Sequence, residues 1–336
     1  MTTVFVSHPQ DKLDHYFGQR ALAQLRSVAD VRCNPEAREL ALPELVAALD
    51  GCDALIAYRG TAGPEALFAA LPQLAAFVRC AIDIRTVDVP AASRHGVLVT
   101  QASAGFIASV SEWIVGAMVD LGRGTSRYAA AYHAGQVPAP AMGRQLRGST
   151  LGVVGYGQIA RYLCELALAL GMQVRVAAPE AVPAQGALRQ AALPALLAES
   201  DFVVCLAPAK PETWHLFDAA AFAAMRPGAF FVNAARGELV DEAALLAALD
   251  AGHLGGAALD VGMAPDQMPS PALARHPRVV AAPHIGGLTP PAIEHQALET
   301  VAQLGALLRG EMPPGAVNAG DATRVRRWPA FAAATA

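Results

Sequence analysis

Residues 151–160 read LGVVGYGQIA, and this stretch decides the fold. A strand of small apolar residues runs into Gly155, and an apolar helical stretch follows Ala160. Gly155 permits a tight turn, Gly157 lets the backbone approach a pyrophosphate, and the small Ala160 lets helix and strand pack closely. The phosphates would then lie at the helix N-terminus, where N–H groups and the helix dipole favour anions. The stretch predicts a dinucleotide site in which the cofactor contacts Gly155, Gly157, Gln158 and Ile159.

The next strand of this series, 173–177, ends without the acidic residue that a dinucleotide site usually places there. That acid stands about 20 residues after the glycines and accepts the adenosine ribose hydroxyls. Ala178 occupies the position in this chain. Glu180 could replace the acid from two residues later, or it is simply a solvated charge. No Arg or Lys stands beside Ala178 to hold a 2′-phosphate, so we expect NAD as the cofactor, bound near Ala178. NADP remains an alternative cofactor.

Around this motif the chain alternates short β-rich runs with Ala/Leu-rich helical stretches, which favours parallel sheets in an α/β fold. The predicted strands cover 4–7, 28–33, 54–58, 76–80, 97–101, 151–155, 173–177, 202–206, 229–233, 257–261 and 279–282. A long helix over 108–122 and a Gly/Pro-broken stretch over 135–148 separate the two series. Asp241 is predicted to cap the helix that follows it. A last helix over 292–309 ends at Gly310, and the tail from Met312 is expected to be irregular.

Composition excludes several classes of protein. The chain has 336 residues, enough for about two domains. With 54% hydrophobic residues and a net charge of −4, it is a globular protein without a basic field for nucleic acid. We expect no transmembrane helix and no signal peptide. The cysteines are odd in number and scattered, which favours a reduced cytoplasmic enzyme over a disulfide scaffold or a metal site; they are Cys33, Cys52, Cys80, Cys164 and Cys205.

Several short motifs follow one another through the second half of the chain. They are SDFVV (200–204), Pro208, Glu212-Thr213, MRPG (225–228), NAARG (233–237), VDE (240–242), ALDV (258–261) and PHIGG (283–287). In order and spacing they resemble the D-isomer-specific 2-hydroxyacid dehydrogenases. The resemblance extends more loosely over the first hundred residues.

This resemblance implies two doubly wound parallel-sheet domains, a Rossmann cofactor domain and a flavodoxin-like substrate domain. Residues 1–100 and 290–336 would form the substrate domain, and residues 101–289 the dinucleotide-binding domain. It also implies a homodimer in which the segment before the glycine turn reaches across to the partner. Further cofactor contacts are implied at Pro208, Thr213, Ala235, Asp260 and Gly286.

Two residues of these motifs suit the reduction of a 2-oxo acid, which needs a cation for the substrate and a proton donor. Arg236 follows a strand, and its guanidinium fork matches a planar carboxylate, so we expect it to bind and polarise the substrate. His284 also follows a strand, and histidine is the side chain best suited to proton transfer near neutral pH. We expect His284 to donate or accept the proton.

The chain departs from the family pattern beside His284. The family usually carries a glutamate five residues after the Asp of its LDV motif, and this acid pairs with the catalytic histidine. Pro265 occupies that position here. If the loop bulges by one residue, the carboxylate of Asp266 can pair with His284, and we expect it to do so. A second possibility is that Gln267 lies beside His284, as in the family's formate dehydrogenases.

The predicted substrate loop is the second departure. Family members commonly hold the substrate carboxylate on the backbone of a glycine-rich turn, but this chain has Ala81 and Asp83 there. An aspartate beside a bound carboxylate repels it unless Arg85 or Arg79 neutralises it or its side chain points away. Ile82 and Asp83 are therefore predicted substrate contacts in a pocket that differs from the common lactate or glycerate type.

The leading hypothesis is an oxidoreductase that transfers a hydride between NAD(P)H and a 2-oxo acid or D-2-hydroxy acid. One alternative is a corepressor-like protein that senses NAD(H) without turnover, and the other is formate oxidation. The presence of both Arg236 and His284 favours the enzyme, because a pure sensor does not need the pair.

Overall fold

The computed structural model describes residues 2–334, which form two compact units. The first unit extends to Gly105 and resumes at Pro290, and the second is Phe106–Thr289. Each unit has its own parallel β-sheet. The predicted α/β class with two doubly wound parallel sheets is confirmed.

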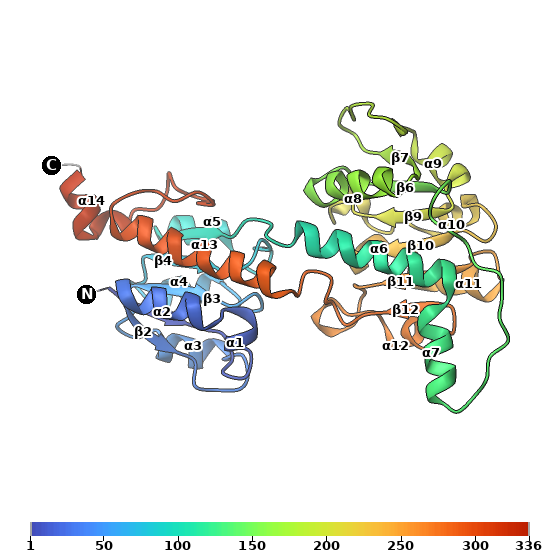
Figure 1. Cartoon of the computed structure of the whole chain (residues 1–336). Helices are drawn as coiled ribbons and strands as arrows, with labels where there is room; N and C mark the ends of the chain where they lie inside the picture. Colours follow the sequence, from blue (N-terminus) through green and yellow to red (C-terminus); the bar gives the residue numbers. More distant parts are fainter. Residues whose placement is uncertain (1, 335–336) are drawn as a thin grey trace. The chain divides into compact units, whose positions relative to one another are not determined.

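The first unit is built on a five-stranded sheet in the order β2-β1-β3-β4-β5, with every pair parallel. Successive residues of β1 pack on opposite faces, Val4 and Val6 on one and Phe5 on the other. Helices α2 and α13 cover the first face, and α3, α4 and α5 cover the second (Figure 1). The strands are β1 (Thr3–Val6), β2 (Asp30–Cys33), β3 (Ala54–Ala57), β4 (Ala76–Arg79) and β5 (Leu98–Gln101). The helices are α1 (Leu13–Tyr16), α2 (Gln19–Val28), α3 (Leu42–Ala48), α4 (Glu65–Ala70), α5 (Val89–Arg94), α13 (Pro290–Leu308) and α14 (Pro329–Ala334).

The C-terminal tail is more ordered than its composition predicts. Val325 and Trp328 are buried in the core of the first unit, and α14 follows them. The guanidinium of Arg324 donates to the carbonyl oxygens of Leu71 and Leu74, at 2.6 and 3.0 Å. The expectation of an irregular tail is wrong in this part, because contacts to residues some 250 positions earlier in the chain order it.

The second unit has a seven-stranded sheet in the order β12-β11-β10-β9-β6-β7-β8, again parallel throughout. Helices α6 and α8 pack on one face and α9, α10 and α11 on the other. The strands are β6 (Thr150–Val154), β7 (Gln173–Ala177), β8 (Leu188–Gln190), β9 (Phe202–Cys205), β10 (Phe230–Asn233), β11 (Gly256–Leu259) and β12 (Val279–Ala281). The helices are α6 (Ile107–Arg123), α7 (Thr125–His133), α8 (Gln158–Ala169), α9 (Leu193–Glu199), α10 (Ala219–Ala224), α11 (Glu242–Asp250) and α12 (Pro271–Ala274).

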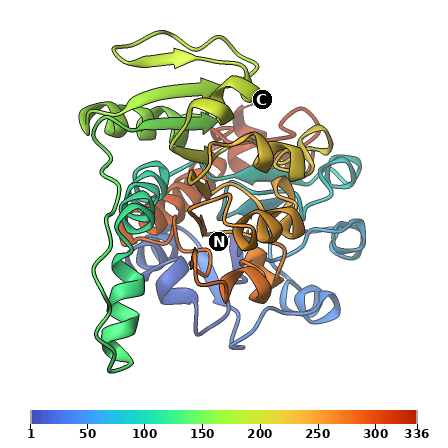
Figure 2. The same ribbon diagram turned by 90° about the vertical axis from the view of Figure 1, so that its right-hand side faces the viewer.

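The short edge strand β8 and the helix α7 are among the elements of this unit that escape sequence analysis. Helix α7 buries none of its residues, so no apolar periodicity marks it. Helix α7 and the stretch that follows it lie away from the sheet of their unit (Figure 2). The predicted cap of α11 is confirmed, since the Asp241 carboxylate accepts the N–H groups of Ala243 and Ala244. Within residues 2–334 no helix is long and apolar enough to span a membrane.

Candidate cofactor and active site

The predicted cofactor and catalytic residues of the second unit gather at one edge of its sheet. Because the strands are parallel, their carboxyl ends lie at the same edge, where open α/β sheets bind ligands. The sheet order reverses between β6 and β9, which places the switch point beside the glycine turn. The residues that follow these strands are Gly155 (β6), Ala178 (β7), Pro208 (β9), Ala235 and Arg236 (β10), Asp260 (β11) and His284 (β12).

The glycine turn fits a pyrophosphate. Gly155 has φ +98°, and a side chain there would lie 2.6 Å from the Leu206 carbonyl oxygen, so only glycine fits. Gly157 opens α8, and the space beyond its Cα is free of protein atoms for 4 Å. The first main-chain bond of this helix runs from Arg161 N–H to Gly157 O, at 3.0 Å. The N–H groups of Gln158 and Ile159 precede it, so the helix itself offers them no acceptor and an anion can take that place.

The loop predicted to lie at the adenosine ribose is braced by a side chain that sequence analysis did not single out. Gln190, on β8, donates to the carbonyl oxygens of Ala178 and Glu180, at 2.9 Å each. Its side-chain oxygen accepts Val182 N–H at 3.1 Å. The loop after β7 is therefore fixed from an edge strand 12 residues away, while Ala178 is half-buried and Glu180 is exposed.

Pro208 and Thr213 belong to one closed loop after β9. The Thr213 hydroxyl donates to Pro208 O at 2.7 Å and accepts Lys210 N–H at 2.9 Å. These bonds give Thr213 a role in shaping the loop. Its contact with a cofactor, like that of Pro208, stays a prediction.

Arg236 is positioned by its own motif. The side chain of Asn233, at the end of β10, accepts Ala235 N–H at 3.0 Å and donates to Arg236 O at 2.9 Å. The half-buried guanidinium donates to Ala235 O at 2.7 Å. A side chain on Gly237 would overlap the carbonyl of Gly262 and lie 2.8 Å from its Cα. The motif thus folds a tight turn that presents Arg236 at the sheet edge, with Asn233 as an unpredicted brace.

Asp260 holds the loop that follows His284. The carboxylate is buried, and its oxygens accept the N–H groups of Ile285 and Gly286, at 2.8 Å each. Burial raises the pKa of Asp260, while the two N–H groups and the nearby His284 oppose that rise. The structure therefore gives Asp260 a bracing role, and contact of Asp260 or Gly286 with the cofactor stays a prediction.

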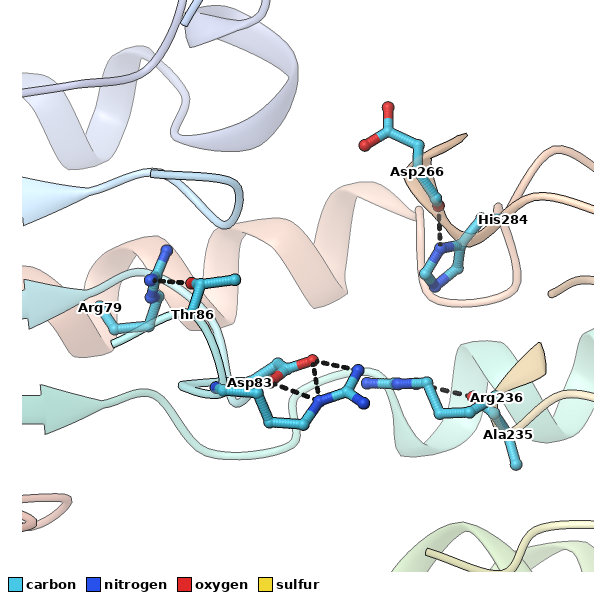
Figure 3. A network of polar contacts seen from close by, with 8 residues as sticks. Arg79, Asp83, Thr86, Ala235, Arg236, Asp266 and His284 are labelled. Atoms are coloured by element: carbon cyan, nitrogen blue, oxygen red, sulfur yellow. Dashed lines mark hydrogen bonds and ion pairs between the residues drawn. The ribbon is translucent and has the colours of Figure 1, made fainter. Parts of the chain in front are cut away.

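His284 contacts Asp266, but through the main-chain oxygen of Asp266 and not through the predicted carboxylate. The ring Nδ1 lies 3.0 Å from the main-chain oxygen of Asp266, and the carboxylate points away from the imidazole (Figure 3). Asp266 has φ +59° and His284 has φ +56°, so both residues adopt the left-handed conformation. The backbone of Asp266 turns its carbonyl toward the ring, and this replaces the predicted carboxylate contact.

This contact also determines which ring nitrogen of a neutral imidazole carries the hydrogen. A carbonyl oxygen can only accept, so Nδ1 carries the hydrogen and donates it. The remaining nitrogen, Nε2, is then the atom that gains or loses a proton. Gln267, beside Asp266, also has positive φ, and its side-chain oxygen is buried without a hydrogen-bond partner.

The predicted substrate residues belong to the first unit. Ile82 and Asp83 lie in the loop after β4, and Ile82 is 37% exposed. Asp83 accepts the main-chain N–H of Arg85 at 2.9 Å and pairs with its guanidinium at 2.9 Å. Arg85 therefore offsets the negative charge of Asp83. This is one of the predicted ways in which Asp83 could lie beside a bound carboxylate without repelling it.

Comparison with known proteins places this geometry in a family. Residues 115–286 match the model of the D-isomer specific 2-hydroxyacid dehydrogenase NAD binding domain. A (S)-sulfolactate dehydrogenase of Chromohalobacter salexigens is 38% identical over 245 residues, 71% of this chain and 79% of that protein. A D-3-phosphoglycerate dehydrogenase of Mycobacterium bovis is 34% identical over 281 residues, 82% of this chain. The match spans 53% of that relative, so this chain corresponds to about half of it.

A solved structure is also similar to this chain in fold. The crystal structure of a Thermus thermophilus protein covers 94% of this chain with a TM-score of 0.85 and 30% sequence identity. The relatives are oxidoreductases of 2-hydroxy acids, which supports hydride transfer with NAD and not the sensor or formate alternative. The chain therefore belongs to the D-isomer-specific 2-hydroxyacid dehydrogenase family and carries its NAD-binding domain.

Proposed function

We propose that the chain reduces a 2-oxo acid to the D-2-hydroxy acid, or catalyses the reverse reaction. The second unit would bind NAD, and the first would supply the substrate loop. The observation that carries this proposal is the edge of the seven-stranded sheet, where Arg236 and His284 follow β10 and β12 and the glycine turn follows β6. Bound NADH supplies the hydride for the 2-oxo carbon.

In this proposal Arg236 binds the substrate carboxylate and polarises its carbonyl. Guanidinium forms paired hydrogen bonds with planar carboxylates and stabilises negative charge on a nearby oxygen. Its bond to Ala235 O and the brace from Asn233 restrict where the group can point.

His284 supplies the proton to the nascent alkoxide from Nε2 and takes it back in the reverse direction. The Asp266 carbonyl holds the ring through Nδ1. In catalytic histidines, a hydrogen bond to the other ring nitrogen generally orients the imidazole in this way. Asp266 is then a positioning residue through its main chain. Ile82 and Asp83 would contact the substrate from the first unit.

The relatives suggest a substrate class. Sulfolactate and 3-phosphoglycerate, in the names of two of them, both carry a second anionic group beside the 2-hydroxy acid. The first unit has cations over aromatic rings just after β1 and β3, with Lys12 5.8 Å from the Tyr58 ring centre and Arg59 5.1 Å from the Tyr16 ring centre. We propose a 2-oxo acid with a second acidic group as substrate.

Three finer points complete the proposal. NAD is preferred over NADP, because the loop at Ala178 carries no cation for a 2′-phosphate.

The chain forms a homodimer through α7 and the stretch after it, where Val137 is 87% and Met142 is 102% exposed. Sedimentation velocity tests this assembly. The enzyme works in the cytoplasm, in keeping with five free cysteines.

The experiment follows the oxidation of NADH and NADPH with a panel of 2-oxo acids that includes sulfonated and phosphorylated ones. His284→Gln should lower kcat by about 10²–10⁴-fold, the usual contribution of a general acid. His276→Gln is the matched control, because His276 pairs with Asp250 elsewhere in the same unit, at 3.4 Å.

Two outcomes would contradict the proposal. Tight NADH binding without turnover of any oxo acid would favour a sensor. Formate oxidation that His284→Gln leaves unchanged would favour the formate reaction, which needs no proton transfer.

A further inference from the structure

Arg79, the last residue of β4, is a charged side chain in the interior of the first unit. It is 0% exposed. One terminal nitrogen donates to Thr61 O at 2.7 Å and to the Thr86 hydroxyl at 2.8 Å, and the other donates to Tyr58 O. Burial of a charge is unfavourable unless hydrogen bonds compensate it, and an apolar side chain of similar size would avoid that cost. The position of these acceptors suggests what the charge does.

The three acceptors come from two different loops. Tyr58 and Thr61 belong to the loop after β3, and Thr86 lies in the loop after β4 that also contains Ile82 and Asp83. Both loops leave the carboxyl edge of the parallel sheet. A single guanidinium therefore fastens one loop to the other, and Figure 3 shows its bond to Thr86.

Side-chain and main-chain hydrogen bonds, and not left-handed backbone turns, hold the loop of residues 80–86. Within that range no residue has a positive φ, so the loop lacks the left-handed turn that a glycine-rich sequence would allow. Cys80 and Ala81 are buried, and Asp83 pairs with Arg85 at 2.9 Å. Main-chain bonds also leave the loop, since Gly63 N–H donates to Thr86 O at 2.9 Å and Ala102 N–H donates to Ala81 O at 3.1 Å. Arg79 adds a buried, charged side-chain connection between this loop and the loop after β3.

The guanidinium is charged at neutral pH. Burial lowers the pKa of Arg79 to about 10, and Asp83 opposes that shift. Since Asp83 is close enough to influence it, Arg79 also offsets part of the negative charge that Asp83 would present to an anionic substrate.

We propose that Arg79 is a positioning residue for the substrate, which fixes the loop of Ile82 and Asp83 against the loop of Tyr58 and Thr61. This inference rests on the proposed function for its kinetic part, and its structural part stands by itself. Arg79 does not contact the reacting atoms in this role. It sets the conformation of the backbone that meets the substrate carboxylate.

The kinetic test compares Arg79→Met and Thr86→Val with the wild type, and uses Arg32→Met as control. Arg32 also donates to a main-chain oxygen in the first unit, Asp50 O at 3.0 Å, but on an exposed surface. Arg79→Met should raise KM for the 2-oxo acid about tenfold or more, the equivalent of one charged hydrogen bond, with kcat and NADH affinity within about threefold. Arg79→Lys should restore part of the KM.

A double-variant cycle isolates the bond to Thr86. Thr86→Val removes the acceptor and keeps the shape, so it should raise KM in the same direction but less. The double variant Arg79→Met with Thr86→Val should be no worse than Arg79→Met alone, because the bond is already absent. Additive effects, or a KM equal to that of Arg32→Met, would overturn the proposal.

Hydrogen exchange provides a readout that needs no turnover. Amides of residues 80–86 should exchange faster in Arg79→Met and Thr86→Val than in Arg32→Met, in the free protein. Unchanged exchange would refute the positioning role even if the enzyme is active. Faster exchange in a protein that turns over no oxo acid would support the role of Arg79 in the loop and locate the failure in the proposed function. If Arg79→Met does not fold, Thr86→Val and Arg79→Lys carry the same test.

Discussion

Replacing Asp260 by Asn should loosen the loop that carries His284. Asp260 is 3% exposed, and its oxygens accept Ile285 N–H and Gly286 N–H at 2.8 Å each. Asn has nearly the same shape but offers one acceptor oxygen and one NH2 donor group. Whichever way the amide is turned, one of the two N–H groups then faces a donor.

The magnitude follows from these two contacts. A hydrogen bond to a charged group contributes about 1.5–3 kcal/mol, and a buried donor without an acceptor costs about 1–3 kcal/mol. Removal of the buried charge offsets part of this loss, because burial raises the pKa of Asp260 and so disfavours its ionised form. We expect the free energy of unfolding to fall by about 2 kcal/mol. Because His284 directly precedes the released N–H groups, kcat should fall about 100-fold.

The assay combines kcat, KM and NADH affinity with urea unfolding, and Asp241→Ala is the control. Asp241 accepts two N–H groups at 3.0 and 3.1 Å in the same unit, but at the start of α11. Loss of this cap in Asp241→Ala should cost about 0.5–2 kcal/mol and leave kcat unchanged. If both variants lose similar stability and similar kcat, the link from Asp260 to His284 is refuted.

Three further predictions concern other parts of the chain. His8 is 1% exposed, and burial lowers its pKa from 6.5 to about 3. Only the unfolded chain takes up a proton there as the pH falls below 6.5, so stability should drop by about 1.4 kcal/mol per pH unit, up to about 5 kcal/mol. Urea unfolding at several pH values should show a shallower slope for His8→Phe, and parallel slopes would contradict this. Gly237→Ala should cost about 1–3 kcal/mol by overpacking against Gly262 and should lower kcat. Gly320→Ala, where the added methyl group meets nothing within 4 Å, should show neither effect in the same assays. Ala178→Asp should raise the preference for NADH over NADPH about tenfold, because a carboxylate accepts the ribose hydroxyls and repels a 2′-phosphate. Glu180→Gln should leave the ratio of kcat/KM unchanged, and a lowered ratio would show that Glu180 already fills this role.

The comparisons confirm the family, the parallel α/β fold and NAD as cofactor. The roles of individual site residues, the substrate and the assembly stay predictions. The strand and glycine turn of residues 151–157 and the cap at Asp241 could be read from the sequence because turn chemistry and apolar periodicity are local signals. A β-rich run, a glycine and a helical stretch lie within a few residues of one another, so neighbours alone specify them.

Only the tertiary structure decided the details that fix the site. The Asp266 carbonyl contacts His284 because the backbone at Asp266 is left-handed, and no pattern in the sequence indicated that conformation. Gln190 braces the loop at Ala178 from an edge strand too short to predict. The same holds for Arg79, since its sequence position beside Cys80 says nothing about Thr61, 18 residues earlier. The sequence by itself determined most of the elements that form, because their causes are local. Which atoms meet across those elements depends on packing between distant segments, and only the folded chain settles it.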